Sequence, residues 1–236
     1  MPDDAASVAA VIVNFRQEGY LPALFESLSN QTLAPSSVVL VNSERTQFTP
    51  PQGTHVIDMA RNMGYAAALN LGIDWAMRHG AGSVMLLNAD TKLDRECLKT
   101  LTETGGDIVQ PLVLLMRDPD RINVAGLKPT FLGVAYCMGY RKPRGWAGTS
   151  VREIPAASGS AMLVRRQVFD RIGAFDEEYF MYLEDLDFSL RAKNAGFIVV
   201  LNPGAIAWHE YRLRLGPKKL FRLFDGSKKI RRLLRS

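Results

Sequence analysis

The chain has 236 residues, 47% of them hydrophobic and 22% charged, an ordinary composition for a globular protein that can bury a core of its own. Its two cysteines, Cys97 and Cys137, show no CxxC spacing, which excludes a disulfide framework and predicts reduced thiols in a cytosolic protein. The acidic start Met1–Asp4 lacks the basic segment of a secretory signal, and no apolar run approaches the roughly 18 residues that cross a bilayer.

The net charge of +5 is unevenly placed along the chain. Residues 212–236 hold ten Lys or Arg and one acid, Asp225, for a net charge of +9, so the first 211 residues sum to about −4. A mildly acidic globule with a basic tail argues against a nucleic-acid surface spread over the fold, and we expect no nucleic-acid partner.

The first third of the chain alternates between strand and helix patterns. Ser7–Phe15 is nearly continuous in apolar residues, as a buried parallel strand is, and helical spacing follows over Leu21–Leu28. The next predicted elements are a strand at Val38–Val41, a short strand at His55–Asp58, a helix at Tyr65–His79 and a strand at Ser83–Leu87. Such β-then-α units imply a parallel sheet, in which ligands lie beyond the C-terminal strand ends. The polar residues at these ends are Asn14, Arg16, Asn42, Ser43, Asn88 and Asp90.

Small residues gather at the start of the helix predicted from Tyr65. Gly64 and the alanines at 66–68 leave little side-chain bulk, so either another group approaches the backbone closely or the helix packs tightly on the sheet. On this segment alone, close packing is the favoured interpretation; Asn62 and Asn70 flank the segment. Neither the G-x-G-x-x-G fingerprint of dinucleotide sites nor the P-loop pattern occurs in the chain.

The segment Asn88-Ala89-Asp90 is an acidic element at a strand end. Asn88 and Asp90 project to the same side of an extended backbone, because side chains repeat with a period of two. A carboxylate beside an amide oxygen suits a hard divalent cation that takes other ligands from substrate phosphates, and a simple turn is an equal alternative. His209, at another strand end, is by itself more often structural, but with Asp90 and a diphosphate available a metal-ligand role becomes comparable.

The middle of the chain is less regular. Residues 105–155 hold spaced glycines and interleaved aromatic and basic side chains, and we interpret them as a variable lobe that contacts a second substrate. A strand entered through small residues is predicted at Ala156–Val164, a helix at Gln167–Ile172 and another strand at Gly196–Leu201.

The most informative stretch is 173–191, where six carboxylates are interleaved with aromatic and aliphatic side chains. The apolar run Phe180–Leu183 predicts a buried segment, from which Glu184 and Asp185 emerge at the start of a helix. A helix N-terminus favours acids, so capping would explain one such carboxylate. The Glu-Asp pair together with Asp187 favours instead the wall of an active site, where one carboxylate takes a proton from a hydroxyl.

Seven segments in order resemble the family 2 glycosyltransferases of the GT-A fold, the bacterial rhamnosyltransferases in particular. They are Val11–Phe15, Asn62–Gly72, Leu86–Asp90, Ser158–Leu163, Gly173–Glu177, Phe180–Asp187 and Trp208-His209. The resemblance implies an α/β fold with a mixed, mainly parallel, Rossmann-like sheet flanked by helices. It further implies one domain at 1–211, with a nucleotide-sugar half at about 1–104 and an acceptor half at about 105–211, before a basic amphipathic tail at 212–236.

The resemblance also implies residue roles. Asp90 would hold Mg²⁺ or Mn²⁺ against the diphosphate, and His209 would complete the metal site. Asp185 would be the general base, with Glu184 and Asp187 as supporting carboxylates. The nucleotide-sugar site would include Asn14, Arg16, Asn42, Asn62, Gly64, Asn70, Asn88, Ser158 and Gly159.

The expected reaction is a single displacement with inversion, which moves a sugar, rhamnose by the resemblance, to a hydroxyl of a glycan or a lipid-linked acceptor. One departure concerns the donor: Asn42-Ser43-Glu44 lacks the Asp with which the family usually recognises the base, so dTDP-, UDP- and GDP-linked sugars all stay open. Desolvation by Phe180–Leu183 would raise the pKa of Asp185 and the helix N-terminus would lower it, and the sequence leaves that balance open.

The basic segment 217–236 is amphipathic, and it either binds an anionic membrane interface or is a docking helix or a solvated tail. We expect a cytoplasmic enzyme that is peripheral on the inner face of the membrane. Two other functions stay open: a non-catalytic nucleotide-sugar or glycan-binding protein on the same scaffold, and a sugar nucleotidyltransferase. The latter should carry a glycine-rich loop after its first strand, where this chain has Asn14-Phe15-Arg16-Gln17.

Overall fold

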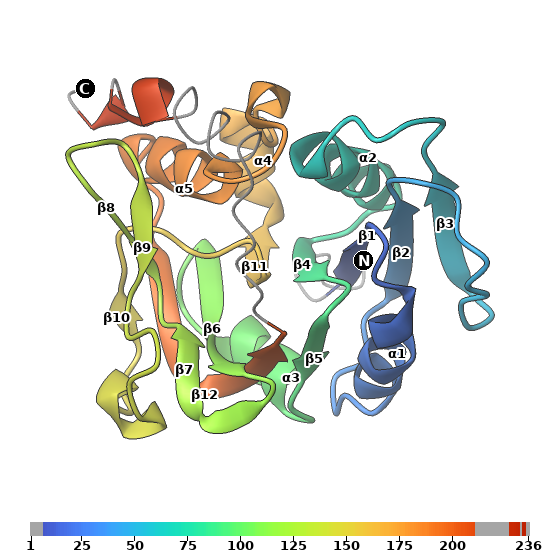
Figure 1. Ribbon diagram of the computed structural model, residues 1–236, viewed down its shortest axis with the longest axis horizontal. Coiled ribbons are helices and arrows are strands. Elements are labelled where there is room, and N and C mark those ends of the chain that lie inside the picture. The colour runs from blue at the N-terminus through green and yellow to red at the C-terminus, as the bar shows by residue number, and fades with distance from the viewer. Residues whose placement is uncertain (1–6, 211–226, 232, 235–236) are drawn as a thin grey trace.

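The structure is a computed structural model that describes residues 7–210, 227–231 and 233–234. Strands and helices alternate through most of this part of the chain (Figure 1). In chain order the elements are β1 (Val8–Asn14), η2 (Glu18–Tyr20), α1 (Leu21–Ser29), β2 (Ser37–Asn42), β3 (Thr54–Asp58), α2 (Tyr65–Arg78), β4 (Ser83–Asn88), β5 (Thr91–Leu93), α3 (Cys97–Glu103), β6 (Ile108–Leu115), β7 (Asp118–Val124), β8 (Leu127–Pro129), β9 (Ala135–Cys137), η3 (Arg144–Ala147), β10 (Arg152–Glu153), β11 (Ala161–Arg165), α4 (Arg166–Ile172), η4 (Glu177–Tyr179), α5 (Glu184–Asn194) and β12 (Val199–His209).

A ten-stranded mixed sheet runs through the molecule. Its strand order is β10-β12-β6-β11-β4-β1-β2-β3, with β5 paired to β12 and β7 paired to β6. The neighbours β3, β2, β1 and β4 are parallel, and β6 and β12 are parallel to each other, whereas β11 runs antiparallel between β4 and β6. The predicted α/β fold with a mixed, mainly parallel sheet is confirmed.

Helices cover both faces of the sheet because its central strands are apolar on both sides. All seven residues of β1 are buried, and alternate residues belong to two different clusters, one shared with α2 and the other with α1. Residues of α4 pack in the cluster of α2, and residues of α3 pack in that of α1.

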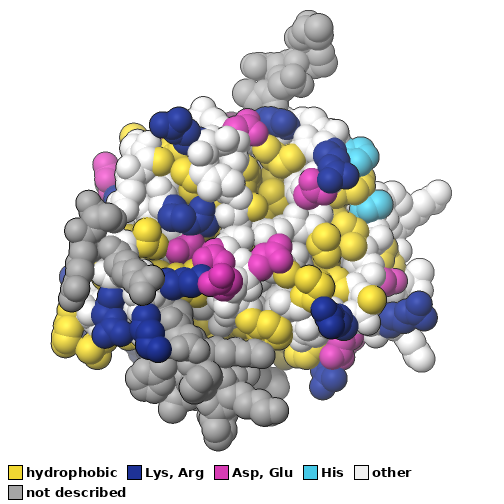
Figure 2. All heavy atoms as spheres, turned by 90° about the horizontal axis from the view of Figure 1, so that it is seen from above, with side chains coloured by type: hydrophobic (Ala, Val, Ile, Leu, Met, Phe, Trp, Pro, Cys, Tyr) yellow, Lys and Arg dark blue, Asp and Glu magenta, His cyan; other side chains and the backbone are white. Residues whose placement is uncertain are grey.

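Figure 2 views the molecule from above, where acidic side chains gather near the middle with Lys and Arg side chains beside them.

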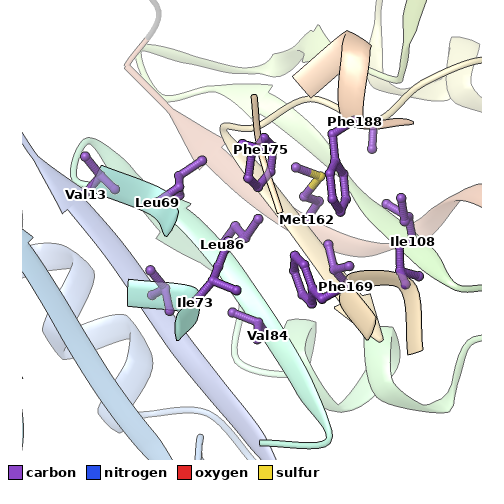
Figure 3. Close-up of a cluster of buried hydrophobic side chains, with 14 of the residues drawn as sticks. Val13, Leu69, Ile73, Val84, Leu86, Ile108, Met162, Phe169, Phe175 and Phe188 are labelled. Carbon is purple, nitrogen blue, oxygen red and sulfur yellow. The ribbon is translucent and has the colours of Figure 1, made fainter. Parts of the chain in front are cut away.

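An aromatic part of the core anchors α5 to the sheet. The ring of Phe188 lies 4.5 Å from that of Phe175 and 5.5 Å from that of Phe169, measured between centroids. Figure 3 shows these rings beside Met162 of β11, with Leu86 of β4 in the same cluster. The packing fixes the helix at whose start the acidic residues stand.

The small residues of α2 serve packing, as the favoured interpretation of the sequence holds. Ala66, Ala67, Ala68 and Gly72 are all buried in the helix face that contacts the sheet. A Cβ atom added at Gly72 would collide with the Val11 side chain of β1, so the glycine allows the helix to lie close to the strand.

Residues 105–155 are interpreted from the sequence as less regular, without a strand at their start, but they contain β6. This strand is buried over all but its last residue and lies inside the sheet between β12 and β11. Gln110 and Pro111 interrupt its apolar pattern, and a proline argues against a central strand. The sheet accommodates it because β12 is irregular opposite Pro111, where the register passes from Asn202 to Ile206.

Two predicted strands have different bounds in the structure. β11 begins at Ala161 rather than at Ala156, because residues 156–160 turn away from the ladder, and the strand predicted at 196–201 is the first half of one long strand, β12. In the part of the chain that the structure describes, no helix is long and apolar enough to span a membrane.

The C-terminal segment is described only from Ser227, so residues 212–226 of the predicted tail lie outside the described residues. Residues 227–231 are helical, and Ile230 is fully buried in the cluster that also contains Leu127 and Leu186. Lys229 forms ion pairs with Asp176 and Glu178. For this last stretch, the docking alternative is therefore the one that the structure supports.

Candidate active site

Asp90 stands in the turn between β4 and β5 with only 5% of its surface exposed. Its Oδ2 accepts a hydrogen bond from Gln17 Nε2 at 2.7 Å. Its Oδ1 is buried and has no hydrogen-bond partner among the described residues, although it lies 3.2 Å from His209 Nε2. The pairing of β5 with β12 positions the histidine, because His209 is the partner of Thr91 in that ladder.

The other ring nitrogen of His209 lies 2.9 Å from Asn123 Oδ1. That oxygen can only accept, so Nδ1 carries a proton and donates it. Nε2 then faces both Asp90 Oδ1 and the Asn88 side chain, whose Nδ2 is 3.3 Å away. The histidine is oriented in the way that a supporting hydrogen bond orients metal-ligating imidazoles.

One observation indicates that a divalent cation would fit between Asp90 and His209. The buried, unpartnered Asp90 Oδ1 and the neighbouring His209 Nε2 are satisfied together when a proton or a cation lies between them. No group of three or more acidic, His or Cys side chains that could hold a metal occurs among the residues described. A cation here would therefore complete its coordination with phosphate oxygens and water, as Mg²⁺ commonly does.

The second acidic element begins at α5. Asp185 Oδ2 accepts the Gly159 N–H at 2.9 Å, and Asp185 Oδ1 accepts the Leu186 N–H at 2.8 Å. Burial raises the pKa of Asp185 and these N–H groups lower it, with the net direction upward. The balance that the sequence left open is thus decided by desolvation.

Glu184 is 5% exposed, and its Oε2 has no hydrogen-bond partner in the described part of the chain. Burial, followed by the charge of Asp185, raises the pKa of Glu184 to about 8. Backbone hydrogen bonds from Glu184 itself and from Tyr182 lower this pKa, but by less than burial and the charge of Asp185 raise it. With a pKa of about 8, the Glu184 carboxyl is largely neutral at neutral pH.

Asp187 is placed differently from its two neighbours. One oxygen accepts the Tyr179 hydroxyl at 3.1 Å, and the other accepts Arg191 Nε at 2.7 Å. Arg191 also donates to the carbonyls of Ile172 and Ala174. Asp187 therefore ties α5 to the preceding chain directly through Tyr179 and indirectly through Arg191, and a supporting role in catalysis stays a prediction for Asp187.

The run Phe180–Leu183 was expected to be buried, but only Leu183 is; the other three residues are half-buried. Phe180, Tyr182 and Leu183 have positive φ angles of 55°, 72° and 70°, a strained left-handed backbone for non-glycine residues. This loop reverses the chain into α5. The Phe180 carbonyl accepts the Tyr65 N–H at 2.5 Å, directly over Gly64. The close approach at Gly64 is thus made by the protein's own backbone.

Tyr65 joins the two acidic elements. Its hydroxyl lies 2.6 Å from Asn88 Oδ1 on the Asp90 side and 2.9 Å from the Gly159 carbonyl on the Asp185 side. Burial and the charges of Glu184, Asp185 and Asp90 raise the pKa of Tyr65 well above its usual value. The loop at Asp90 and the helix at Asp185 therefore meet around one phenol. The sequence pattern does not indicate this role for Tyr65. It shows only a tyrosine at the first helical position after Gly64.

Asn14 and Asn42, predicted to bind the nucleotide, stand at the ends of β1 and β2. Asn14 Nδ2 donates to Asn42 Oδ1 at 2.9 Å, and Asn42 Nδ2 donates to Asp58 Oδ1 at 2.8 Å. This series of hydrogen-bonded side chains thus ends at the Asp58 carboxylate on β3. Asp58 lies beside the end of β2, where the chain lacks the Asp that is usual in the family. Arg16 is exposed and forms an ion pair with Glu44 at 2.9 Å.

The remaining predicted nucleotide-site residues divide into two groups. Ser158 and Gly159 lie in the segment before β11 that contacts Asp185, with the Ser158 N–H donated to Gln110 Oε1. Asn62 caps the Gly64 N–H, and Asn70 exchanges hydrogen bonds with the backbone of Phe175. The amide of Asn70 therefore ties α2 to the segment before α5.

A groove of about 700 Å³ lies elsewhere, between α1, β5 and the end of β12. It is lined by Glu26, Ser27, Ser29, Asn30, Gln31, Lys92, Leu93, Asp94, Arg95 and Trp208. None of the predicted site residues is among them. Trp208 and His209 are adjacent on a strand, so their side chains point to opposite faces of the sheet.

Comparison with known proteins gives a family and several relatives. The chain matches the glycosyltransferase-like family 2 over residues 5–225. An N-acetylglucosaminyl-diphospho-decaprenol L-rhamnosyltransferase of Mycobacterium tuberculosis is 30% identical in an alignment that covers 84% of this chain and 74% of the relative. A hexosyltransferase of low-salt glycan biosynthesis in Haloferax volcanii is 28% identical, covering 79% and 61%. A dTDP-rhamnosyl transferase of Shigella flexneri is 26% identical, covering 84% and 67%.

Solved structures share the fold. GalNAc-T7 with UDP, GalNAc and Mn²⁺ superposes with a TM-score of 0.67 at 15% identity, covering 88% of this chain and 44% of that one. TarS of S. aureus gives a TM-score of 0.61, also at 15% identity, covering 92% and 38%. These likenesses confirm the predicted GT-A fold. The chain spans about three fifths of the Haloferax relative and less than half of either solved chain.

Proposed function

Because the chain belongs to the glycosyltransferase-like family 2, we propose that it is an inverting glycosyltransferase that moves a sugar from a nucleoside diphosphate sugar to an acceptor hydroxyl. The observation that carries the proposal is the meeting of Asp90 and Asp185 around Tyr65, since single displacement needs a charge-neutralising corner and a base at one centre. A dTDP-linked rhamnose is the first donor to try, because one relative is named a dTDP-rhamnosyl transferase. A lipid-linked acceptor is supported by the name of another.

Asp90 and His209, with the Asn88 amide beside them, would hold Mg²⁺ or Mn²⁺. When bound, the cation would neutralise charge on the diphosphate leaving group. Gln17 and Asn123 then orient the two ligands through their hydrogen bonds. These contacts keep the carboxylate and the imidazole in place before any substrate arrives.

Asp185 is the proposed base. Its two backbone donors hold the carboxylate in one orientation, and partial burial raises its pKa toward the range in which a carboxylate can accept a proton from a hydroxyl. Glu184 beside it, with its raised pKa, adds little negative charge to that wall at neutral pH. The acceptor hydroxyl would approach this wall while the donor lies toward Asp90.

Asp185→Asn tests the proposal directly. We expect sugar transfer to fall about 10²- to 10⁴-fold, because the amide cannot accept the proton. Donor binding, measured by thermal shift with dTDP-, UDP- and GDP-sugars and Mn²⁺, should be retained. Asp74→Asn, at an exposed ion pair on α2, is the matched control and should leave transfer unchanged. Full transfer by Asp185→Asn would contradict the assignment of the base.

An assay of the wild-type protein distinguishes a glycosyltransferase from a non-catalytic sugar-nucleotide-binding protein. Binding of a donor without turnover, in the presence of Mn²⁺ and a range of acceptors, would favour that alternative. Formation of a nucleoside triphosphate and a sugar 1-phosphate from the nucleotide sugar when pyrophosphate is added would instead favour a nucleotidyltransferase.

A further inference from the structure

The hairpin of β8 and β9 ends in an exposed apolar turn. The Gly133 N–H donates to the Thr130 carbonyl at 2.9 Å, and the Thr130 N–H donates to the Val134 carbonyl at 2.8 Å, so the turn is tightly closed. Phe131 and Leu132 occupy its two corner positions and are 86% and 54% exposed. Such corners usually hold Gly, Asn, Asp, Ser or Pro, and two large apolar side chains held in water there need a partner.

The C-terminal helix supports this turn from one side. The backbone of Gly133 lies against the Ser227 carbonyl, and a Cβ added to this glycine would lie 3.0 Å from Arg231 Cγ. Arg231 is exposed. The apolar tip therefore stands beside a basic side chain of a separate segment, and its backbone is held at that place.

The lobe that carries the hairpin is basic throughout. Residues 121–152 contain six Lys or Arg and no Asp or Glu. Lys128 and Tyr136 are directly opposite each other on the outward face of the hairpin, and both are exposed. In Figure 2, hydrophobic and basic side chains lie side by side at the left edge, on the side where Figure 1 places the hairpin.

The inward face of the same hairpin leads to the proposed base. Leu127, with Ala135 and Cys137 partly buried against it, packs in the cluster that contains Leu183 and Leu186 at the start of α5. Asp185 lies between those two leucines in the sequence. Whatever the hairpin tip binds is therefore brought to the acceptor side of the site.

We propose that the hairpin tip, Phe131 and Leu132, inserts into the interface of an anionic lipid bilayer, with Lys128 and Arg231 contacting its head groups. The inference rests on the proposed function, in that the bilayer would present a lipid-linked acceptor to Asp185. A tip of two side chains suits a fluid interface, which adapts to any shape, better than a stable protein partner, which usually buries about 800 Å² on each side. The surrounding positive charge complements anionic lipid.

The test is flotation of the full chain with vesicles of phosphatidylcholine alone and with 30% phosphatidylglycerol. We expect the wild-type protein to float with the anionic vesicles and Phe131→Ser/Leu132→Ser to lower its partition coefficient at least tenfold. The matched control is Val56→Ser/Ile198→Ser, two residues 37% and 48% exposed on other surfaces, which should bind as the wild type does. Lys128→Glu/Arg231→Glu should abolish the preference for anionic vesicles.

Three outcomes would overturn the inference. The wild-type protein could fail to float with either vesicle. The serine pair could float unchanged while the charge variant does not, which would mean purely ionic binding. Light scattering after gel filtration could show a dimer that the serine pair abolishes, which would make a second copy the partner.

The proposed function is tested separately. Donor binding by thermal shift and transfer to a soluble acceptor should be the same in Phe131→Ser/Leu132→Ser and the wild type, because neither residue lies in the proposed site. Vesicle binding without any sugar transfer would leave the membrane inference standing and remove the proposed function. Transfer without vesicle binding would do the reverse.

Discussion

A single phenol holds the centre of the site together at the scale of individual residues. The Tyr65 hydroxyl has one hydrogen and lies within hydrogen-bond distance of two acceptors, Asn88 Oδ1 and the Gly159 carbonyl. Its raised pKa keeps it protonated, so it remains a donor to one or the other at every physiological pH. It therefore couples the orientation of the Asn88 side chain, beside Asp90 and His209, to that of the backbone that holds Asp185.

Tyr65→Phe removes this hydrogen and leaves two acceptors without it. We expect kcat to fall about tenfold, which corresponds to the ~1.4 kcal/mol of one lost hydrogen bond, while the donor KM changes little. Steady-state kinetics across Mn²⁺ concentrations provides the measurement, and the half-saturating Mn²⁺ concentration should rise. Tyr136→Phe, on the exposed face of β9, is the control. Unchanged kcat and Mn²⁺ dependence in Tyr65→Phe would show that the phenol only fills space.

Glu184 makes stability depend on pH. Its carboxyl has a pKa of about 8 in the folded protein and near 4.5 when unfolded, so between these values the folded state binds more protons and the free energy of unfolding falls as pH rises. Glu184→Gln removes that cost. We expect the variant to match the wild type at pH 5 and to exceed its stability by about 4 kcal/mol at pH 9. Urea unfolding at both pH values measures this, and a difference that does not grow with pH would contradict the raised pKa.

At the scale of elements, the site depends on one loop that is pressed against one helix. The strained turn at 180–183 lies over the start of α2, and the Phe180 carbonyl is the acceptor for the first helical N–H. Gly64 makes this contact possible in two ways, since its φ is +105° and its Cα faces the Phe180 backbone.

Gly64→Ala should therefore be costly. The added Cβ would lie 2.5 Å from the Phe180 carbonyl oxygen, and the alanine would have to adopt a left-handed backbone conformation. We therefore expect a loss of about 2–4 kcal/mol in the free energy of unfolding. Gly53→Ala is the control, because its φ is +87° but no atom lies within 4 Å of the added carbon. It should cost only about 1 kcal/mol. Equal losses in the two variants would mean that the contact with Phe180 contributes nothing.

The elements themselves could be predicted wherever the signal is local. β1, α2 and β4 follow from apolar periodicity, and their bounds agree with the predicted ones to within a residue or two. β6 was missed because Gln110 and Pro111 break its pattern, and what makes them tolerable is the irregular partner strand β12 and the hydrogen bonds of Gln110. No local pattern contains that information.

The site could be predicted as a set of residues but not as a set of contacts. The sequence indicated Asp90, His209 and Asp185, and the structure brings the first two together and connects them to the third. The sequence could not indicate that Asp187 is held by Tyr179 and Arg191, because tertiary packing decides which face of α5 meets which neighbour. Their catalytic and binding roles stay predictions until the variants are measured.

At the scale of the whole molecule, the chain end returns to the β8–β9 hairpin and α5. Lys229 lies 5.4 Å from the centroid of the Tyr179 ring and forms ion pairs with two acids that precede that tyrosine, Asp176 and Glu178. Because Lys229 and these acids are at least partly exposed, their ion pairs contribute little to stability. Ile230 is fully buried in the cluster that contains Leu127 of the hairpin and Leu186 of α5, so its burial contributes more than these ion pairs do.

Ile230→Ser tests whether this last helix is part of the fold. Removing a fully buried aliphatic side chain costs about 2–4 kcal/mol, so the midpoint of urea unfolding should fall clearly. Leu234→Ser, 40% exposed on the same segment, should change stability by less than about 0.5 kcal/mol. Because the helix contacts the turn of the β8–β9 hairpin, hydrogen exchange at residues 130–137 should also become faster in Ile230→Ser. If the two variants unfold alike and the hairpin stays protected, the C-terminal helix does not stabilise the fold, and the hairpin is held by its other contacts alone.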